Sequence, residues 1–530
     1  MCAVCIPAGR RYGARFRVTV SEDTRALVRE RLLAEVGRLD KVAPHRVALT
    51  YPSPYRVAMS SLGYQRIYRA IQEMPGFAAE RVFLPDEGDR PGARIERPFS
   101  YESSRELGEF PVIAVSVAYE LELAGLVRMF DASRIPAFAS ERDETAPFVL
   151  AGGPLTFSNP VPLAPFADAI VMGEGEGLAE RCLEIIVAAR SRRDALEALA
   201  KLEHVYVPAL HGETPPRPAA ADDASLPAHS VIRTPHTELS NMFLIEPERG
   251  CSRGCTYCVM RRSTNGGMRL VPKEVVLERI PPDVRRVGLV GAAVSDHPRI
   301  VDILNALADR GCEVGISSLR PDRLKDEFVG ALRRVGYRTL TTALDGPSER
   351  LRGLIERRGR EEHYVAGAER AKKHGMDRVK LYLMIGLPGE TDEDIDECSR
   401  FVGELSRILP IALGVAPFCS KRNTPLDRMP FAGMRVVESR MERLRHGLRG
   451  RADVRAMSAR WAWVEWVLAQ GGFAEGMALA KATRAGGRFA DFKRAFAELG
   501  HTPDGEGYAA AVMPVAPERA KLRRLTIARA

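Results

Sequence analysis

The chain has 530 residues and a formal net charge of +9 at pH 7, and 45% of its residues are hydrophobic while 28% are charged. This balance is typical of folded globular chains and excludes a fibrous or disordered protein, and no stretch is apolar over the length that a bilayer crossing requires. The basic residues are spread among acidic ones, so the charge does not indicate a nucleic-acid partner. We expect a cytoplasmic protein that does not associate with membranes.

The N-terminal half alternates between helical and strand-like patterns. Residues 1–46 have helical spacing and predict a helical lead-in, and residues 47–210 alternate short apolar runs with helical stretches. Such alternation predicts a parallel sheet covered by helices. The apolar runs are 47–50, 81–84, 112–116, 148–151 and 169–172. Residues 211–240 are rich in proline, alanine and small polar residues, which predicts a linker and a domain boundary.

A second series of strand-like runs fills residues 241–425. Amphipathic helical segments separate these runs, so six βα units are expected, which favours an open barrel over the closed barrel of eight. The runs are 242–246, 286–290, 313–317, 339–344, 379–385 and 412–417. Residues 426–530 predict a helical C-terminal domain that ends in a polar tail.

Three cysteines directly follow the first run of this second series, in the stretch EPERGCSRGCTYCVMRR. Cys251, Cys255 and Cys258 have the spacing C-x3-C-x2-C. Three thiolates on one tight loop can hold three irons of a cubane [4Fe–4S] cluster and leave the fourth iron open to a substrate. Gly250 and Gly254 let the loop bend, and functional sites are built at the carboxyl ends of barrel strands. A zinc site is the alternative, but structural zinc takes four ligands, and no further cysteine or histidine lies nearby in the sequence.

The cysteine loop resembles the signature of the radical S-adenosylmethionine (SAM) superfamily, with Tyr257 at the aromatic position before the last cysteine. The resemblance implies that the open iron binds the amino and carboxylate groups of SAM. It also implies that one-electron reduction yields methionine and a 5′-deoxyadenosyl radical, with an external reductant such as flavodoxin or ferredoxin as partner.

Two further segments resemble the same family. KLYLMIGLPGETDEDI at 380–395 is similar to the fifth-strand segment, in which the backbone of Ile385, Gly386 and Leu387 would face the adenine of SAM. TTALDGPSERLRGLI at 341–355 is similar to the fourth-strand segment, where many relatives have glutamate and this chain has Asp345. That aspartate could reach the ribose or the amino group, or could belong to a helix cap.

The resemblance is incomplete after the second barrel strand. The family's usual Gly-Gly-Glu, which binds the amino group of SAM, is replaced by Gly291-Ala292-Ala293, so only backbone contacts can be expected at Gly291. Ser317 and Arg320, after the third strand, are candidates to contact the carboxylate or ribose of SAM, since arginine pairs well with carboxylates. A surface salt bridge is the alternative for Arg320.

Residues 47–210 resemble the cobalamin-binding Rossmann-like domain that precedes the barrel in one subgroup of the family. Parallel sheets bind cofactors at the carboxyl ends of their strands. The candidate cobalamin contacts are therefore Tyr64, Ser116, Tyr119, Gly152, Gly153, Gly173 and Glu174. The alternative is that the glycines form tight turns and that the tyrosines pack in the interior. No Asp-x-His-x-x-Gly follows the first strand, so no histidine is placed to bind cobalt from below.

These features together predict a radical SAM enzyme, with cobalamin as a further cofactor, that methylates an unactivated carbon of a small-molecule or peptide substrate. Cobalamin-dependent rearrangement or cyclisation is an alternative. A methylthiotransferase would need a second cluster in the first domain, where only Cys182 lies, and a non-enzymatic cobalamin or SAM sensor would not need the three-cysteine loop. Cys419, just past the sixth strand, is a candidate hydrogen donor at the barrel mouth, or else a buried structural thiol.

Overall fold

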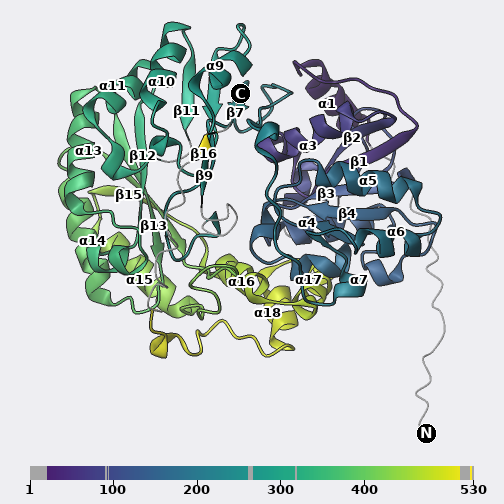
Figure 1. Ribbon diagram of the computed structural model, residues 1–530. Helices are drawn as coiled ribbons and strands as arrows, with labels where there is room; N and C mark the ends of the chain where they lie inside the picture. The colour runs from purple at the N-terminus through teal and green to yellow at the C-terminus, as the bar shows by residue number, and fades with distance from the viewer. Residues whose placement is uncertain are drawn as a thin grey trace.

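The computed structural model of the protein describes residues 21–89, 92–93, 95–260, 267–316, 319–513 and 526–527. Figure 1 shows two α/β halves side by side, with the C-terminal helices α16 (Ala459–Gln470), α17 (Phe473–Ala485) and α18 (Phe489–Ala497) below both. No helix in this described part combines the length and the apolar character that a bilayer crossing requires.

The N-terminal half is a six-stranded sheet in the order β2-β1-β3-β4-β5-β6, parallel except for the last strand. The strands are β1 (His45–Tyr51), β2 (Phe77–Phe83), β3 (Val112–Ser116), β4 (Phe148–Gly152), β5 (Ala169–Val171) and β6 (Val205–Tyr206). The order 2-1-3-4-5 is that of a doubly wound sheet, in which connections leave to opposite faces on either side of β1 and ligands bind at the carboxyl ends near that point. The predicted Rossmann-like fold is confirmed.

Helices cover both faces of this sheet. They are α1 (Glu22–Leu33), α2 (Tyr55–Ala58), α3 (Leu62–Glu73), α4 (Glu122–Ala132), α5 (Leu178–Ala188), α6 (Arg192–Leu199) and α7 (Pro208–His211). Alternate residues of a strand point to opposite faces, so Val47 and Leu49 pack in the core under α3 and α5, while Ala48 packs in the core under α4. The side chain of Ser61 caps α3, because its Oγ accepts the backbone N–H of Tyr64 at 3.3 Å.

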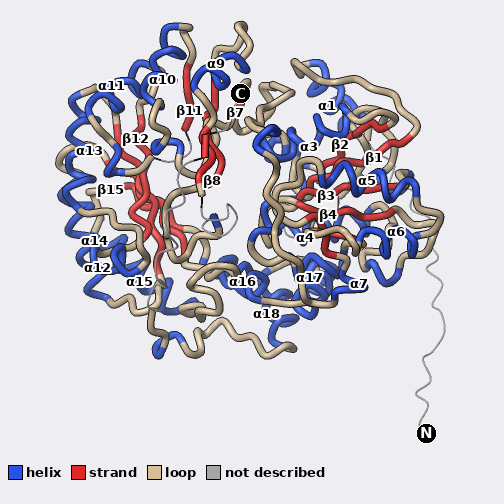
Figure 2. The backbone as a smooth tube through the Cα atoms, viewed as in Figure 1, coloured by secondary structure: helices blue, strands red, loops and turns tan. Residues whose placement is uncertain are grey.

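The second half is an open barrel of parallel strands inside a row of helices (Figure 2). β7 (Phe243–Ile245), β10 (Arg286–Leu289) and β11 (Glu313–Ile316) form one sheet. β12 (Thr339–Asp345), β13 (Arg378–Ile385), β14 (Ile411–Pro417) and β15 (Ala452–Ala456) form the other, and a parallel bridge from Leu319 to Thr342 connects the two sheets. The helices are α9 (Lys273–Arg279), α10 (Ile300–Asp309), α11 (Asp326–Arg334), α12 (Glu349–Leu354), α13 (Glu361–Lys373), α14 (Asp392–Leu405) and α15 (Met434–Gly447).

The six predicted barrel strands are all present, and the structure adds β15 in a part of the chain predicted to be helical. β15 is a short edge strand of sequence ADVRA whose residues alternate between half-buried and exposed, so it lacks the apolar run by which the other strands were predicted. The partial barrel therefore has a seventh parallel strand.

The cysteine loop connects two strands of a small sheet. After β7 the chain forms β8 (Glu248–Gly250), which pairs antiparallel with β9 (Met268–Leu270), and β16 (Thr526–Ile527) pairs parallel with β9. The three cysteines lie between β8 and β9 along the chain.

Two segments join the halves. Asn159 of the N-terminal half donates from Nδ2 to the carbonyl oxygens of Leu468, Ala469 and Gly471 at the end of α16, at 2.8 to 3.3 Å. The predicted linker contacts both halves, because Ala219 pairs with Gly173 and His229 pairs with Ile245 of β7.

Candidate active site

The three cysteines lie together at the carboxyl end of the first barrel strand. Gly250 has φ +103°, a conformation that favours glycine, and it turns the chain from β8 into the loop. Cys255 is buried, and Cys251 and Cys258 are half-buried. The backbone N–H of Arg253 donates to Sγ of Cys251 at 3.4 Å.

The environment of these thiols requires a positive partner. Burial, together with the neighbouring thiols, raises the pKa of Cys251 to about 12. Burial also raises the pKa values of Cys255 and Cys258. Cysteine binds metal as its deprotonated thiolate. Metal cations must therefore compensate the negative charge that three thiolates bring into this loop.

The donor set fits a cubane better than a single ion. In the described part of the chain, no three His, Cys, Asp or Glu side chains converge closely enough to hold one metal ion. A structural zinc needs four ligands around one centre, and the loop supplies three cysteines. In a [4Fe–4S] cluster each thiolate binds its own iron, so three cysteines suffice and leave the fourth iron open.

Side chains from the fourth barrel strand pack behind the cysteine loop. Asp345 is the last residue of β12, has φ +62°, and forms a half-buried ion pair with Arg357, with 2.6 Å between Oδ2 and Nε. Tyr257 hydrogen-bonds Asp345, and burial raises the pKa of its hydroxyl. The positive charge of Arg357 opposes the rise in pKa that burial causes at Cys255, and so partly favours its thiolate. Asp345 thus lies at the predicted place, and the structure gives it a protein partner that the sequence did not suggest.

The end of the fifth barrel strand also reaches the loop. Leu387 is fully buried in an apolar cluster against which Tyr257 packs, so the predicted Ile385, Gly386 and Leu387 lie beside the cysteine loop. The buried carboxylate of Glu390 accepts the backbone N–H groups of Gly386, at 2.9 and 3.0 Å, and of Leu387, at 3.3 Å. Glu390 was not predicted, although it belongs to the GLPGE stretch that carried the resemblance.

The third group of predicted contacts follows β10 and β11. Arg320 is mostly buried, and its guanidinium pairs with Asp296 and with Asp322. Its backbone N–H donates to Oγ of Ser295 at 3.2 Å, which ties it to the segment after Gly291. The predicted Ser317 lies outside the described residues.

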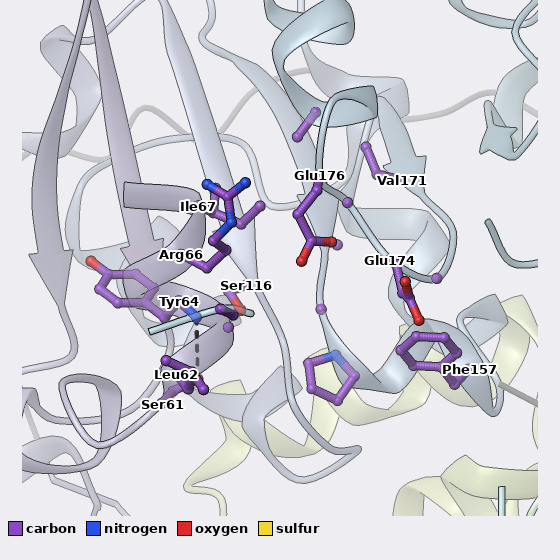
Figure 3. A pocket seen from close by; sticks show the side chains of 18 of the residues that line it. Ser61, Leu62, Tyr64, Arg66, Ile67, Ser116, Phe157, Val171, Glu174 and Glu176 are labelled. Atoms are coloured by element: carbon purple, nitrogen blue, oxygen red, sulfur yellow. Dashed lines mark hydrogen bonds between the residues drawn. The ribbon is translucent and has the colours of Figure 1, made fainter. Parts of the chain in front are cut away.

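A cavity of about 370 Å³ lies at the carboxyl ends of the N-terminal strands. The predicted residues Tyr64, Ser116, Gly152, Gly153, Gly173 and Glu174 all line it. Figure 3 shows its two walls, one from α3 and one from the segments after β4 and β5, with Ser61, Leu62, Tyr64, Arg66 and Ile67 facing Phe157, Val171, Glu174 and Glu176. These six predicted residues therefore share one cavity, and its use for cobalamin stays a prediction.

The lining residues contribute to the cavity in different ways. Gly153 and Gly173 have φ +106° and +83°, and a Cβ there would lie within 2.6 Å of a backbone oxygen, so both glycines are required by the turns. A Cβ on Gly152 would make only ordinary contacts, the nearest at 3.6 Å. Tyr64 is 1% exposed and its hydroxyl donates to the carbonyl of Leu49 at 2.9 Å, so it forms part of the wall.

Tyr119 lies elsewhere. It does not line this cavity but a second one of about 270 Å³, between the ends of β1 and β3 and the C-terminal helices. Its predicted contact with a corrin stays a prediction.

Arg249 connects the cavity to the cysteine loop. It lies two residues before Cys251, lines the cavity, and forms ion pairs with Glu174 at 3.2 Å, Glu176 at 2.8 Å and Glu246 at 2.8 Å. Met260, two residues after Cys258, also lines the cavity. The sequence did not suggest this link, because it depends on how the halves pack together.

Cys419 is not placed as a free reactive thiol. Its Sγ donates to the carbonyl of Ala462 at 3.1 Å, and burial raises its pKa well above the usual value. Lys421, two residues on, pairs with Glu120 of the N-terminal half and Glu465 of α16, both at 2.8 Å. The environment of Cys419 agrees with the structural alternative, and its role as hydrogen donor stays a prediction.

Two family matches follow the same division of the chain. Residues 63–208 match the N-terminal family of radical SAM proteins, and residues 245–402 match the radical SAM superfamily. Together the matches span more than half of the chain. The chain belongs to the radical SAM superfamily. This family implies a [4Fe–4S] cluster and SAM, and the cysteine loop lies inside the second match.

Two curated proteins and one solved structure illustrate what this chain is similar to. An uncharacterized protein of Methanocaldococcus jannaschii is 28% identical over 395 residues, which are 72% of this chain and 79% of that protein. A tRNA-2-methylthio-N(6)-dimethylallyladenosine synthase of Deinococcus radiodurans is 23% identical over 214 residues, 37% of this chain and 39% of that one. Among solved structures, the cobalamin-dependent SAM radical enzyme OxsB with aqua-cobalamin and SAM bound has 11% identity and a TM-score of 0.47, over 88% of this chain and 74% of that one.

Proposed function

We propose that this radical SAM protein is a cobalamin-dependent methyltransferase that acts on an unactivated carbon of a small-molecule or peptide substrate. The observation that carries the proposal is the cavity at the carboxyl ends of the N-terminal sheet, whose wall includes Arg249 and Met260 from either side of the cysteine loop. A cofactor held in that cavity would lie next to the cluster site.

When bound, the cluster supplies the electron that cleaves SAM, and cobalamin supplies a methyl group. The chain's own residues position these groups. Cys251, Cys255 and Cys258 hold three irons, and Arg357 offsets negative charge beside Cys255. The carboxylate of Glu390 fixes the backbone of Gly386 and Leu387, so that this turn offers a rigid surface to adenine.

The cavity supports binding of the nucleotide tail of cobalamin. Most of its lining is apolar side chain or glycine backbone, which allows a flat heterocycle to approach the ends of β3, β4 and β5. None of the described lining residues is a histidine, so this wall would offer a bound cobalamin no histidine ligand.

The balanced reaction defines the products that an assay must measure. One SAM and one electron give methionine and 5′-deoxyadenosine, whose added hydrogen comes from the substrate carbon. A second SAM gives its methyl group and becomes S-adenosylhomocysteine, and a second electron balances the cycle. Reduction therefore needs an external one-electron donor such as flavodoxin or ferredoxin.

The test uses the full chain, reconstituted anaerobically with iron, sulfide and hydroxocobalamin and supplied with SAM that carries a trideuterated methyl group. Protein freed of excess ligand should retain a corrinoid spectrum, and reductant should release 5′-deoxyadenosine. Supplied with cell extract, it should place the label in a product and form S-adenosylhomocysteine in equal amount. Absence of corrinoid from a cluster-loaded protein would contradict the proposal.

Cobalamin-dependent rearrangement is the second candidate, since it needs the same cavity and the same cluster. It differs in its products, because a rearrangement consumes no methyl group and forms no S-adenosylhomocysteine. Methylthiotransfer is less well supported, because residues 47–210 contain a single cysteine, the buried Cys182 of α5, and three would be needed for a second cluster.

A further inference from the structure

The barrel lacks the glutamate that the family resemblance places after the second strand to bind the amino group of SAM. The corresponding residue is Ala293, which is buried and packs in one apolar cluster with Cys251. Two carboxylates from other positions lie close to this point, those of Glu248 and Asp296.

Glu248 shapes the loop and is the more deeply buried of the two carboxyl groups, although its Oε2 has no hydrogen-bond partner among the described residues. Its Oε1 accepts the backbone N–H of Ala293 at 2.8 Å, and a Cβ on Gly291 would lie 2.1 Å from the same oxygen. Glycine at 291 therefore makes room for this carboxyl group. Glu248 is 0% exposed, and burial raises its pKa to about 8, so at neutral pH it is mainly protonated and offers no negative charge.

Asp296 lies on the same segment, three residues after Ala293, and faces the cysteine loop. Its Oδ2 pairs with Arg320 and accepts a hydrogen bond from Oγ of Ser252, the neighbour of Cys251, at 3.5 Å. Its side chain is 4% exposed, and its Oδ1 has no hydrogen-bond partner among the described residues, with Nε of Arg323 at 3.4 Å as its nearest charge. A buried carboxylate oxygen without a hydrogen bond is costly unless a ligand completes it.

We propose that Asp296 binds the α-amino group of SAM and that Arg320 binds its α-carboxylate. The two side chains pair with each other, and an amino acid group carries the charges complementary to both. Inserting that group exchanges one buried ion pair for two, which keeps the site neutral. Asp322 pairs with Nε of Arg320 at 3.1 Å and with Arg253 at 2.9 Å. These contacts would keep the guanidinium of Arg320 in place while the side of it that faces Asp296 binds the ligand.

This inference rests on the proposed function only in requiring that SAM binds beside the cluster. It assigns the amino acid end of SAM to a carboxylate on the segment after the second strand, where the sequence alone left only backbone contacts at Gly291.

The test is equilibrium binding to cluster-loaded protein, measured for SAM, for the analogue that lacks the amino group and for decarboxylated SAM. Asp296→Asn should weaken SAM binding about 10- to 100-fold, the range for a lost charged hydrogen bond, while binding of the deaminated analogue changes less than about threefold. Arg320→Gln should show the converse pattern, with SAM weakened and decarboxylated SAM little changed. Both analogues lose a bond to the open iron in every protein, so only the differences between proteins report on the side chains.

Asp302→Asn is the matched control, since it removes a carboxylate from the ion pair with Arg299, which lies outside the proposed site. It should change SAM binding less than about threefold, because a partly exposed pair contributes little. Iron content is measured for each variant, so that a loss of the cluster is distinguished from a loss of affinity.

Two results would overturn the inference. Asp296→Asn could bind SAM as the unaltered protein does, or it could weaken SAM and the deaminated analogue equally. If the cluster-loaded unaltered protein bound no SAM at all, the proposed function itself would fail, which is a different outcome.

Discussion

Both α/β halves have their candidate site at the carboxyl ends of parallel strands, but the two sites are formed in different ways. In the barrel, side chains of Cys251, Cys255 and Cys258 define the site, and charged side chains such as Arg357 and Glu390 hold it in shape. In the N-terminal sheet, the site is a hollow whose turns depend on Gly153 and Gly173. A metal site therefore depends on the identity of a few residues, whereas a cavity depends on the absence of side chains and on packing.

Removal of one cysteine should break the barrel site completely and leave the cavity intact. Cys255→Ala should lower 5′-deoxyadenosine formation by about 10³-fold or more, because an iron loses its ligand and the thiolate cannot be replaced locally. Cys398→Ala is the control, since Cys398 is buried in α14 away from the loop, and it should keep its iron. Equal activity of both variants would show that the loop is not the cluster site.

The ion pairs of Arg249, which connect the two halves, should contribute strongly to the free energy of unfolding. Arg249→Gln leaves Glu174, Glu176 and Glu246 without their shared partner, and breaking such a buried pair costs about 3–5 kcal/mol. Thermal unfolding should show a clearly lower midpoint. Arg233→Gln removes a pair with Asp283, whose side chain is 63% exposed, and should cost about 0–1 kcal/mol. Similar midpoints for both variants would mean that Arg249 does not hold the halves together.

Filling the cavity should impair corrinoid binding and leave the cluster site in the barrel intact. Gly152→Leu adds a side chain where a Cβ has room, so the fold should tolerate it while the ligand is displaced. Corrinoid affinity should fall about 10- to 100-fold, the range expected when extra methylenes must be accommodated in a packed site. Cleavage of SAM without substrate should persist. A variant that binds corrinoid normally would move the cobalamin site elsewhere.

The smallest effect is expected at the C-terminal helices that support both halves. Glu475 accepts the backbone N–H of Gly472 at 2.6 Å, and its contact with His501 at 2.8 Å is the main cause that lowers its pKa to about 2. The ionised form is favoured by folding, so this stabilisation is present above pH 4.5 and is lost as the pH falls toward 2. Glu475→Gln should cost about 1 kcal/mol at neutral pH and flatten the acid side of the stability profile, measured by denaturant unfolding. An unchanged acid profile would contradict this reading.

Much of the fold could be predicted because buried parallel strands appear as apolar runs. Strands β1 to β5 and the first six barrel strands all overlap such runs, although β2 begins four residues earlier than predicted, while β15 was missed because its residues alternate and lie at an edge. The cysteine loop could be predicted because spacing alone defines a metal site.

The partners of the site residues could not be predicted in the same way. Arg357 lies twelve residues after Asp345 and Arg249 far from Glu174 in sequence, and only folding brings each pair into contact. Asp296 lies at no position that the family resemblance marks. Tyr119 lines a second cavity together with residues of the C-terminal helices, which pack at that end of the sheet. Long-range ion pairs and cavities are properties of packing, and local patterns do not encode them.

The proposed chemistry depends on a [4Fe–4S] cluster held by Cys251, Cys255 and Cys258 with one iron open to SAM. Electron paramagnetic resonance of the anaerobically reconstituted and reduced protein, recorded before and after SAM is added, reports on both properties. We expect a [4Fe–4S]⁺ signal that shifts when SAM binds and that is absent when all three cysteines are alanine. A signal that SAM leaves unchanged, or one that survives the triple substitution, would contradict the proposal.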